Sequence, residues 1–315
     1  MSVVAITGAG GFVGRALVKR LAQGQHEVVP LVRSPIPGNT ASHRDLPNLA
    51  SLAAGEAGVD LSGVDILIHC AAITQSKTNM TEAERQHLFA VNVGGTAALA
   101  REAVVAGVKR FVLLSSAKVN GETTAPGTAF RADDPAAPLD DYGLSKLQAE
   151  QSLVSTAVGT SLETVIIRPP LVYGPGVAGN FRQLIKLSAK GLPLPLGGVH
   201  NRRSMIAVDN LADLIALAMD HDKAAGRILM ASDGEDISTS ELIARLARLQ
   251  GAPVRLLSVP ASILISALAL MGRKGIADRL LSSFQVDSAG TRALLDWTPP
   301  LGVDAALADT ISSPP

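Results

Sequence analysis

The sequence predicts an α/β protein with a doubly wound parallel sheet of the Rossmann type and a smaller carboxyl-terminal lobe. Continuous apolar runs alternate with helical patterns through the first two thirds of the chain. Such runs are typical of strands that helices bury on both faces of a parallel sheet. A glycine-rich turn joins the first apolar run to the first helical pattern, which is the order of a nucleotide-binding βα unit.

The predicted elements follow one another in a regular order. They are a strand at 2–7, a helix at 13–24, strands at 26–32 and 65–72, a helix near 80–106, a strand at 110–116, a helix near 141–158 and a strand at 162–170. Beyond about residue 170 the chain becomes rich in glycine and proline, as in "YGPGVAGN" and "KGLPLPLGGVHN". We therefore expect a nucleotide-binding domain over 1–170 and a lobe over 171–315, interleaved with late elements of the main sheet.

Composition excludes several classes of protein. Hydrophobic residues make up 47% of the 315 residues, and 28 basic residues balance 28 acidic ones, so the broad basic field that nucleic-acid binding needs is absent. The single cysteine, Cys70, lies in the apolar run "DILIHCAA", which indicates a core position and a reducing compartment.

The amino terminus and the apolar segments indicate a cytoplasmic protein without membrane insertion. "MSVVAITGAGG" enters a strand pattern directly and lacks the basic region and apolar stretch of a signal peptide. The most membrane-like segment, "ASILISALALMG" at 261–272, is shorter than the about 20 residues of a membrane-spanning helix. A buried or interface helix is the expected structure there.

The stretch "TGAGGFVG", Thr7–Gly14, predicts a dinucleotide site. Glycines allow a tight turn and let a pyrophosphate approach the amides of the following helix, which begins with Phe12 and Val13. The glycines stand at Gly8, Gly11 and Gly14, and Val13 occupies the place of the last glycine in the standard fingerprint. The position of this loop between a strand and an amphipathic helix carries the prediction.

The end of the second predicted strand bears on the choice of cofactor. An acid there favours NAD(H), whereas this chain has Arg33, a cation suited to a 2′-phosphate. NADP(H) is therefore favoured slightly over NAD(H). The alternative is that Arg33 is a solvated loop residue and that either cofactor binds.

An ordered set of motifs resembles a known family over essentially the whole chain. "DDYGLSK" contains Tyr142 and Lys146 at a Tyr-x-x-x-Lys spacing on one helix face, and "SSA" supplies Ser116 at a strand end. With "TGAGGFVG", "VNVGGT" and "IIRPPLVYGPG", these motifs resemble the extended short-chain dehydrogenase/reductases, in the nucleotide-sugar epimerase/dehydratase branch. The resemblance implies that residues 171–315 bind the substrate.

The resemblance implies catalytic roles that chemistry explains. Hydride transfer at a carbinol carbon needs a group that exchanges the hydroxyl proton, and free tyrosine, with a pKa near 10, is a poor base at neutral pH. A neighbouring ammonium favours the phenolate, so Lys146 is expected to lower the pKa of Tyr142 and to bond the nicotinamide ribose. Ser116 is expected to bond the substrate oxygen.

Further cofactor contacts are implied by the same resemblance. They are Ala71 and Ala72 after the third long strand pattern, Asn92 in "VNVGGT", and Pro169 in "IIRPPLVYGPG". For the acid that contacts adenine, Glu56 is preferred to Asp60, because Asp60 lies too close to the next strand for a helix to intervene. Ala71, Ala72 and Asn92 could also be structural.

Substrate contacts are likewise expected from the resemblance. Arg203 is expected to meet the diphosphate of a UDP-sugar through a bidentate fork. The remaining candidates are Asn180, Phe181, Arg279 and Lys118. A surface position for Arg203 and a core position for Phe181 are the alternatives, and no metal ligands are assigned.

The residues after Ser116 narrow the reaction. The 4,6-dehydratases carry an Asp-Glu pair there, and this chain has Ala117 and Lys118, so dehydration is disfavoured. The resemblance extends to the UDP-N-acetylquinovosamine dehydrogenases, which implies 4-ketoreduction of a UDP-4-keto-6-deoxy-N-acetylhexosamine in bacterial surface polysaccharide synthesis.

Two alternatives to the ketoreductase stay open. The first is a 4-epimerase of UDP-hexoses or UDP-N-acetylhexosamines with bound NAD, and the second is a catalytically silent nucleotide-binding regulatory protein. The resemblance also implies a homodimer that pairs the helices near 80–106 and 141–158.

Overall fold

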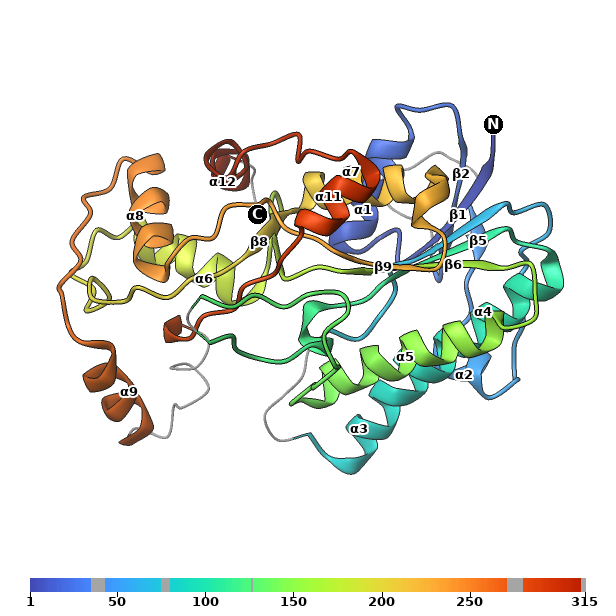
Figure 1. The fold of residues 1–315 in the computed structure, drawn as a ribbon, viewed down its shortest axis with the longest axis horizontal. Coiled ribbons are helices and arrows are strands. Elements are labelled where there is room, and N and C mark those ends of the chain that lie inside the picture. The colour runs from blue at the N-terminus through green and yellow to red at the C-terminus, as the bar shows by residue number, and fades with distance from the viewer. Residues whose placement is uncertain (35–42, 75–79, 126, 271–279, 313–315) are drawn as a thin grey trace.

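The fold is described by a computed structural model, which defines residues 1–34, 43–74, 80–125, 127–270 and 280–312 (Figure 1). The strands are β1 (Val3–Thr7), β2 (Glu27–Val32), β3 (Arg44–Asp45), β4 (Ile66–His69), β5 (Arg110–Leu114), β6 (Glu163–Arg168), β7 (Leu171–Tyr173), β8 (Met205–Ala207) and β9 (Arg227–Met230). The helices are α1 (Phe12–Leu21), α2 (Leu49–Ala53), α3 (Glu82–Phe89), α4 (Gly95–Ala106), α5 (Asp141–Ala157), α6 (Gly179–Ser188), α7 (Val208–Asp220), α8 (Thr239–Leu249), α9 (Ala261–Leu270), α11 (Ala289–Leu295) and α12 (Val303–Ser312). A π-helical turn, Ala90–Gly94, joins α3 to α4.

The main sheet confirms the predicted fold class. Within the described residues it has seven parallel strands in the order β3-β2-β1-β4-β5-β6-β9. The chain moves outward from β1 to β2 and β3, then crosses back to β4 on the other side of β1. This reversal places a switch point between β1 and β4, where α/β sheets bind their ligands at the carboxyl ends of the strands.

Two apolar layers bury the sheet (Figure 1). Val4 and Ile6 of β1 face a layer that contains Leu17 of α1 and Leu211 of α7. Ala5, between them, faces the opposite layer with α2, α4 and α5. Because neighbouring side chains on a strand point to opposite faces, a strand covered on both faces is apolar along its length, as β1 is from Val3 to Ile6.

The smaller lobe has its own core at the other end of the molecule (Figure 1). Tyr173 of β7 and Phe181 of α6 pack there with side chains from α8 and α12. The chain leaves the main sheet after β6, forms β7 and α6, and returns through α7 to add β9 to the sheet. The two parts therefore meet beyond the carboxyl ends of the strands.

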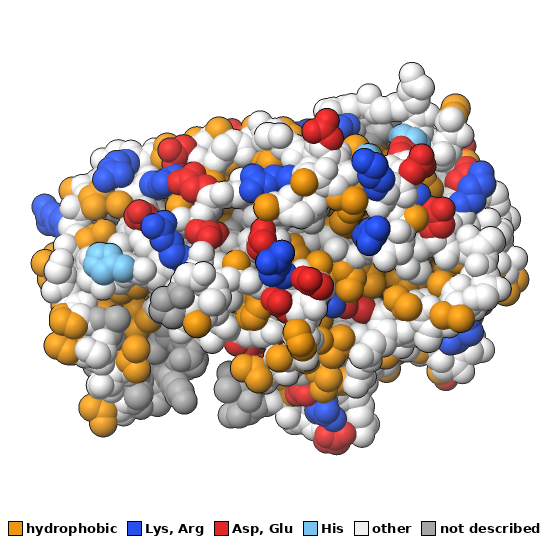
Figure 2. Space-filling model, viewed as in Figure 1, with side chains coloured by type: hydrophobic (Ala, Val, Ile, Leu, Met, Phe, Trp, Pro, Cys, Tyr) orange, Lys and Arg blue, Asp and Glu red, His pale blue; other side chains and the backbone are white. Residues whose placement is uncertain are grey.

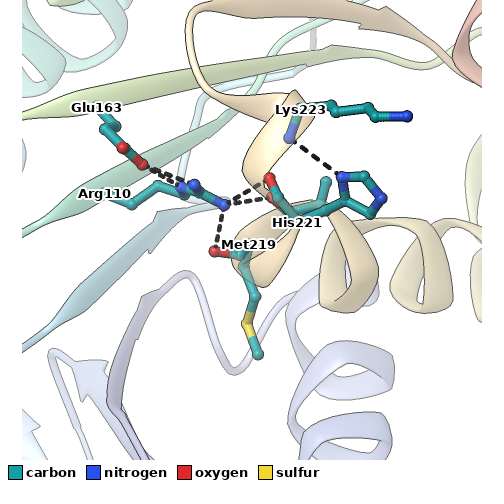
Figure 3. Close-up of polar contacts among 6 residues, drawn as sticks. Arg110, Glu163, Met219, His221 and Lys223 are labelled. Atoms are coloured by element: carbon teal, nitrogen blue, oxygen red, sulfur yellow. Dashed lines mark hydrogen bonds and ion pairs between the residues drawn. The ribbon is translucent and has the colours of Figure 1, made fainter. Parts of the chain in front are cut away.

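At the amino-terminal ends of the strands, a buried arginine bonds the end of α7 (Figure 3). Arg110, at the start of β5 and 7% exposed, donates to the carbonyls of Ala218, Met219 and His221 at distances of 3.1, 2.8 and 3.0 Å. It also bonds the Glu163 carboxylate at 2.9 and 2.6 Å. A cation at the carboxyl end of α7 satisfies carbonyls that have no partner within the helix, and so ties α7 to β5 and β6.

One helical stretch, Glu82–Ala106, is long and apolar enough to cross a membrane by length and composition alone. Half of its most apolar window is buried within the protein, where Leu99 and Ala103 pack under the sheet. Core helices pass the same test, and this packing identifies it as one.

On the face shown in Figure 2, acidic and basic side chains are interspersed.

Candidate active site

The glycine-rich loop begins where β1 ends and forms a tight cradle. Gly8 has a φ of +71°, and a Cβ atom there would lie 2.7 Å from the amide nitrogen of Ala71. A Cβ atom on Gly14 would lie 2.0 Å from the carbonyl oxygen of Gly8. Glycine is therefore required at both positions, because the loop packs directly on α1 and on the segment after β4.

The start of α1 fits the pyrophosphate of a dinucleotide. Gly11 is the residue before the helix and offers no side chain to cap the first amides, while Phe12 and Val13 open the helix half-buried. No acidic residue stands in the first turn. Uncapped amides at a helix amino terminus, approached over glycine, form an anion site. The residues present therefore fit NAD or NADP.

An acid that the sequence patterns did not single out stands at the end of β3. Asp45 ends β3 and pairs in register with Val32, the last residue of β2, so it stands beside the exposed Arg33 at the carboxyl edge of the sheet. A two-residue strand gives almost no apolar signal. The signal that could have found it is the acid followed by buried Leu46, just before the helix at 49–53.

Glu56, the acid expected to contact adenine, does not lie directly after the third strand. The third strand is Arg44–Asp45, and helix α2 separates it from Glu56. Arg44, at the beginning of β3, donates to the carbonyl of Ser62 at 2.8 Å, so the segment that follows Glu56 has already returned to the amino-terminal edge. Glu56 is exposed on this return and does not follow a strand into the site.

A buried histidine connects three parts of the cofactor site. His69 ends β4, and its Nδ1 and Nε2 atoms lie 2.6 and 3.2 Å from the hydroxyl oxygens of Thr7 and Thr96. Burial, and then the Lys146 ammonium, lower the pKa of His69 to about 3, so the ring is neutral. Thr7 also accepts from the amide of Ala71 at 3.3 Å, which fixes the segment of Ala71 and Ala72 beside Gly8.

Asn92 holds the same segment from the other side. Its Oδ1 atom accepts from the amide of Ile73 at 2.8 Å, and its Nδ2 atom donates to the carbonyl of Ile73 at 3.0 Å and to the hydroxyl of Ser145 at 3.0 Å. Asn92 is 1% exposed and lies in the π-helical turn. Since Ser145 precedes Lys146, this amide joins the loop after β4 to the helix that carries Tyr142 and Lys146.

The structure brings Ser116 and Tyr142 together. Ser116 follows β5 and caps a short 3₁₀ turn, where its hydroxyl accepts from the amide of Lys118 at 3.2 Å. The next amide, of Ala117, donates to the carbonyl of buried Pro169 at 2.9 Å, so the end of β6 supports this turn. The Ser116 side chain lies close enough to the Tyr142 hydroxyl to act on its pKa.

The protonation of Tyr142 differs from the expectation that Lys146 lowers its pKa. Burial, and then the nearby Asp140 carboxylate, raise the pKa of Tyr142 to about 12, against the opposing hydrogen bond from Ser116. In this structure Tyr142 is therefore a neutral phenol at neutral pH. It is ready to donate a proton, and it needs an additional positive charge nearby to act as a base.

Lys146 lies one helical turn after Tyr142 and is 2% exposed. Burial lowers its pKa to about 8, although the neighbouring Glu150 and Cys70 favour the charged form. An ammonium in this setting is partly desolvated and available to a hydroxyl or an amide of a ligand.

A buried ion pair supports the floor of the site. Arg168 of β6 and Glu150 of α5 are each 4% exposed. The Nε and Nη2 atoms of Arg168 donate to the two carboxylate oxygens of Glu150 at 2.9 and 2.6 Å, which makes a bidentate pair. Ser115 donates to the same carboxylate, and the Oδ1 atom of Asn120 accepts from Arg168 at 3.1 Å. Asn120 thereby has a structural role: it bonds the bidentate pair and donates to the carbonyl of Arg131 at 2.9 Å.

The predicted substrate residues separate in the structure. Arg203 is half-buried, donates to the carbonyl of Ser282 at 2.9 Å and is close enough to Glu122 for attraction. Asn180 is exposed at the start of α6. Phe181 was expected to face the substrate, but it is 4% exposed and stacks on Tyr173 with ring centroids 5.5 Å apart, so its ring belongs to the core of the lobe. Arg279 lies outside the described residues.

Lys118 is engaged within the protein. Its ammonium lies 2.6 Å from the Asp140 carboxylate and 2.9 Å from that of Glu122. Among the residues that the structure defines, no group of three or more His, Cys, Asp or Glu side chains is placed to hold a metal ion. The site thus combines a glycine-rich loop before a helix, a Ser-Tyr-Lys set and an arginine from the segment before β8.

Comparisons with known proteins agree with this geometry. The sequence matches the NAD dependent epimerase/dehydratase family over residues 4–231. It is 41% identical to a UDP-glucose 4-epimerase of Vibrio cholerae over 300 residues, which cover 94% of this chain and 90% of the relative.

Two solved structures illustrate the likeness of the fold. MoeE5 in complex with UDP-glucose and NAD is 27% identical, with a TM-score of 0.76 over 98% of this chain and 97% of that one. A short-chain dehydrogenase/reductase superfamily protein of Agrobacterium tumefaciens with bound NAD is 22% identical, with a TM-score of 0.77 over 98% and 96% of the two chains. The chain belongs to the NAD dependent epimerase/dehydratase family and has the extended short-chain dehydrogenase/reductase fold.

Proposed function

We propose that this protein catalyses NAD-dependent hydride transfer at C4 of a UDP-sugar and that its net reaction is 4-epimerisation of a UDP-hexose. The observation that carries the proposal is that Ser116 lies beside Tyr142, one helical turn from buried Lys146, at the carboxyl ends of the strands where the glycine-rich loop also lies. The 41% identity to a UDP-glucose 4-epimerase, over nearly the whole of both chains, supports the choice of reaction.

The chain's own residues divide the chemistry between them. When bound, the nicotinamide supplies the hydride acceptor and donor. Tyr142 exchanges the proton of the C4 hydroxyl, and Ser116 bonds the same oxygen and keeps it within reach of the phenol. Lys146 holds the nicotinamide ribose and contributes positive charge beside the phenol. Gly8, Gly11 and Gly14 with the start of α1 bind the pyrophosphate of the cofactor.

The proton balance follows from the raised pKa of Tyr142. A phenol whose pKa is about 12 donates a proton readily when a carbonyl oxygen is reduced. The opposite step, removal of the hydroxyl proton, needs a phenolate, which the positive charges of Lys146 and of the oxidised nicotinamide favour. Epimerisation uses both steps in one cycle.

Arg203 is the residue we assign to the diphosphate of the nucleotide sugar. Its side chain is half-buried, and burial lowers its pKa, although the attraction of Glu122 opposes this. A partly desolvated guanidinium gains most from a dianionic partner that it can bond with two parallel hydrogen bonds. Asn180, at the exposed start of α6, is assigned to the same phosphates.

A second candidate, 4-ketoreduction of a UDP-4-keto-6-deoxy-N-acetylhexosamine, is favoured by one observation. Arg33 is exposed directly after β2, where a 2′-phosphate would be contacted, and NADPH is an exchangeable reductant. A dehydratase reaction is disfavoured, because the two positions after Ser116 lack the required acid and base. Ala117 is fully buried and has no acidic group, and the Lys118 ammonium is paired with two carboxylates.

One experiment separates the candidates. The purified protein is analysed for co-purified NAD(H) and is then given UDP-glucose without added cofactor. Appearance of UDP-galactose with no net cofactor consumption supports the epimerase. Stoichiometric oxidation of added NADPH by UDP-4-keto-6-deoxy-N-acetylglucosamine, without hexose interconversion, replaces it with the ketoreductase. Bound cofactor with neither reaction supports a regulatory protein instead.

A further inference from the structure

The turn after Ser116 and the start of α5 meet around a single lysine. Lys118 lies in the 3₁₀ turn, and its ammonium is 2.6 Å from the Oδ2 atom of Asp140. Asp140 is the residue that caps α5, since its Oδ1 atom accepts from the amide of Gly143 at 2.7 Å. The two oxygens of one carboxylate thus bind the turn and the helix, and the next residue but one along that helix is Tyr142.

The backbones of the two segments approach closely at the same point. A Cβ atom on Gly143 would lie 2.8 Å from the carbonyl oxygen of Lys118, so only glycine permits the contact. On the turn, the amide of Lys118 donates to the Ser116 hydroxyl at 3.2 Å. Lys118 therefore contacts Ser116 through its backbone and the cap of the tyrosine helix through its side chain.

We propose that Lys118 and Asp140 form a positioning pair, in which the lysine fixes Ser116 against Tyr142 and neutralises the carboxylate beside the tyrosine. This rests on the proposed function only in that Tyr142 carries the proton. It replaces the expectation that Lys118 binds substrate, because its ammonium already has two carboxylate partners, Asp140 and Glu122.

The charges around Tyr142 determine the sign of the effect. Asp140 raises the pKa of Tyr142, and no basic group other than Lys118 contacts Asp140 in the described structure. The other charged groups of this region are Lys146 on α5, Glu122 on the turn with Arg203 facing it, and Asp141, whose carboxylate pairs with Arg85 of α3 at 2.9 Å. Removal of the Lys118 ammonium leaves Asp140 unscreened, so the pKa of Tyr142 should rise; removal of the Asp140 charge should lower it.

The test uses the phenolate absorbance of Tyr142, which does not depend on the substrate. The chain has two tyrosines, and burial with the Asp233 carboxylate raises the pKa of the other, Tyr173, beyond the range of the titration. The protein with bound NAD is titrated through the alkaline range as Lys118→Met, Lys118→Arg, Asp140→Asn and the double variant Lys118→Met/Asp140→Asn, with Tyr142→Phe to identify the signal. Lys109→Met is the matched control, because Lys109 pairs with Asp65 at 2.8 Å at the opposite end of β5.

The proposal predicts a pattern across these variants. The midpoint rises by about half a pH unit or more in Lys118→Met, falls by a similar amount in Asp140→Asn and is near normal in Lys118→Arg and Lys109→Met. In the Asp140→Asn background, Lys118→Met should add no further shift. A matching shift in the alkaline limb of UDP-glucose oxidation is expected where that activity is present.

Three results would overturn the proposal. They are an unchanged midpoint in Lys118→Met, an equal shift in both backgrounds, or an unchanged midpoint with a raised KM for UDP-glucose, which would make Lys118 a substrate ligand. Absence of any turnover on UDP-hexoses would contradict the proposed function and leave the titration as the test of the pair. Because Lys118→Arg keeps the charge, it shows whether a loss in Lys118→Met reflects misfolding of the turn.

Discussion

Single side chains decide the protonation chemistry of this site. Tyr142 is half-buried, and burial and the Asp140 carboxylate raise the pKa of its hydroxyl, which lies near Ser116. Asn92 bonds Ile73, and His69 bonds Thr7, which in turn bonds Ala71, so both side chains position the segment after β4. The family resemblance predicted that Tyr142 exchanges the proton, and the groups around Tyr142 determine its protonation state.

Replacement of Tyr142 by phenylalanine tests the proton-transfer role. The change keeps the ring and removes the group that exchanges the C4 proton, so we expect turnover of UDP-glucose to fall by about 100-fold or more. Binding of NAD should persist. Tyr173→Phe is the matched control, since its hydroxyl bonds Asp233 at 2.8 Å in the smaller lobe, and it should lower stability without a comparable loss of turnover. Unchanged turnover in Tyr142→Phe would exclude the proposed mechanism.

His69 should make stability depend on acid pH. Its pKa is lowered to about 3 in the folded state, from 6.5, so its contribution is complete above pH 6.5 and is lost as pH falls through that value towards the folded pKa. At about 1.4 kcal/mol per pKa unit, the free energy of unfolding should fall by roughly 3 to 5 kcal/mol over this window. Urea unfolding of the protein and of His69→Gln at several pH values measures it, and equal slopes for both would contradict the assignment.

At the scale of the elements, the ends of the strands and the starts of two helices form the site. Each strand of the main sheet delivers its last residues to one edge, and α1 and α5 begin there with different caps: a bare glycine at α1 for an anion, and Asp140 at α5. At the other edge, Arg110 closes the end of α7.

Gly14→Ala tests the cradle. Its Cβ atom would lie 2.0 Å from the Gly8 carbonyl oxygen, so the loop must move away from the start of α1. We expect the affinity for NADH to fall by about tenfold or more, measured by calorimetric titration. Gly58→Ala is a suitable control, because no atom lies within 4 Å of its Cβ position, and it should bind as the parent does. Equal affinities would show that the cradle does not hold the pyrophosphate.

Arg110→Met tests the opposite edge. The change removes the ion pair with Glu163 and leaves three carbonyls near the end of α7 without this donor, so we expect a loss of about 2 to 4 kcal/mol in the free energy of unfolding. Lys109→Met, at an exposed pair one residue away, should cost at most about 1 kcal/mol. Cofactor affinity should be unchanged in both, because this edge lies away from the site.

At the scale of the whole molecule, two cores are joined by a chain that leaves the sheet and returns. Arg203 comes from the segment before β8 and Ser116 from the end of β5, so the two residues belong to different parts of the molecule. A substrate that bridges them must span both parts of the protein.

The molecule is expected to form a homodimer through the helices around α4 and α5. Val105 and Val154 on these helices are 85% and 46% exposed, which is unfavourable for apolar side chains left in water. Light scattering at micromolar concentration should give twice the mass of the 315-residue chain, and Val154→Glu should shift the mass towards one chain. A monomeric mass for the parent protein would contradict this expectation.

The sequence by itself determined the features that depend on local order. Consecutive apolar positions predict strands buried on two faces, glycine spacing predicts the cradle, and the Tyr-x-x-x-Lys spacing places Tyr142 and Lys146 on one helix face. These are short-range consequences of strand and helix geometry, and the sheet and the glycine loop formed as expected.

Only the tertiary structure decided the features that depend on contacts between distant segments. The two-residue strand β3 places Asp45 beside Val32 at the carboxyl ends of the strands, and the packing of the smaller lobe turns Phe181 inward onto Tyr173. Lys118 meets Asp140, 22 residues away, and burial raises the pKa of Tyr142 where the helix spacing alone predicted a decrease. Burial and charge pairing depend on which segments become neighbours, and local spacing does not contain that information.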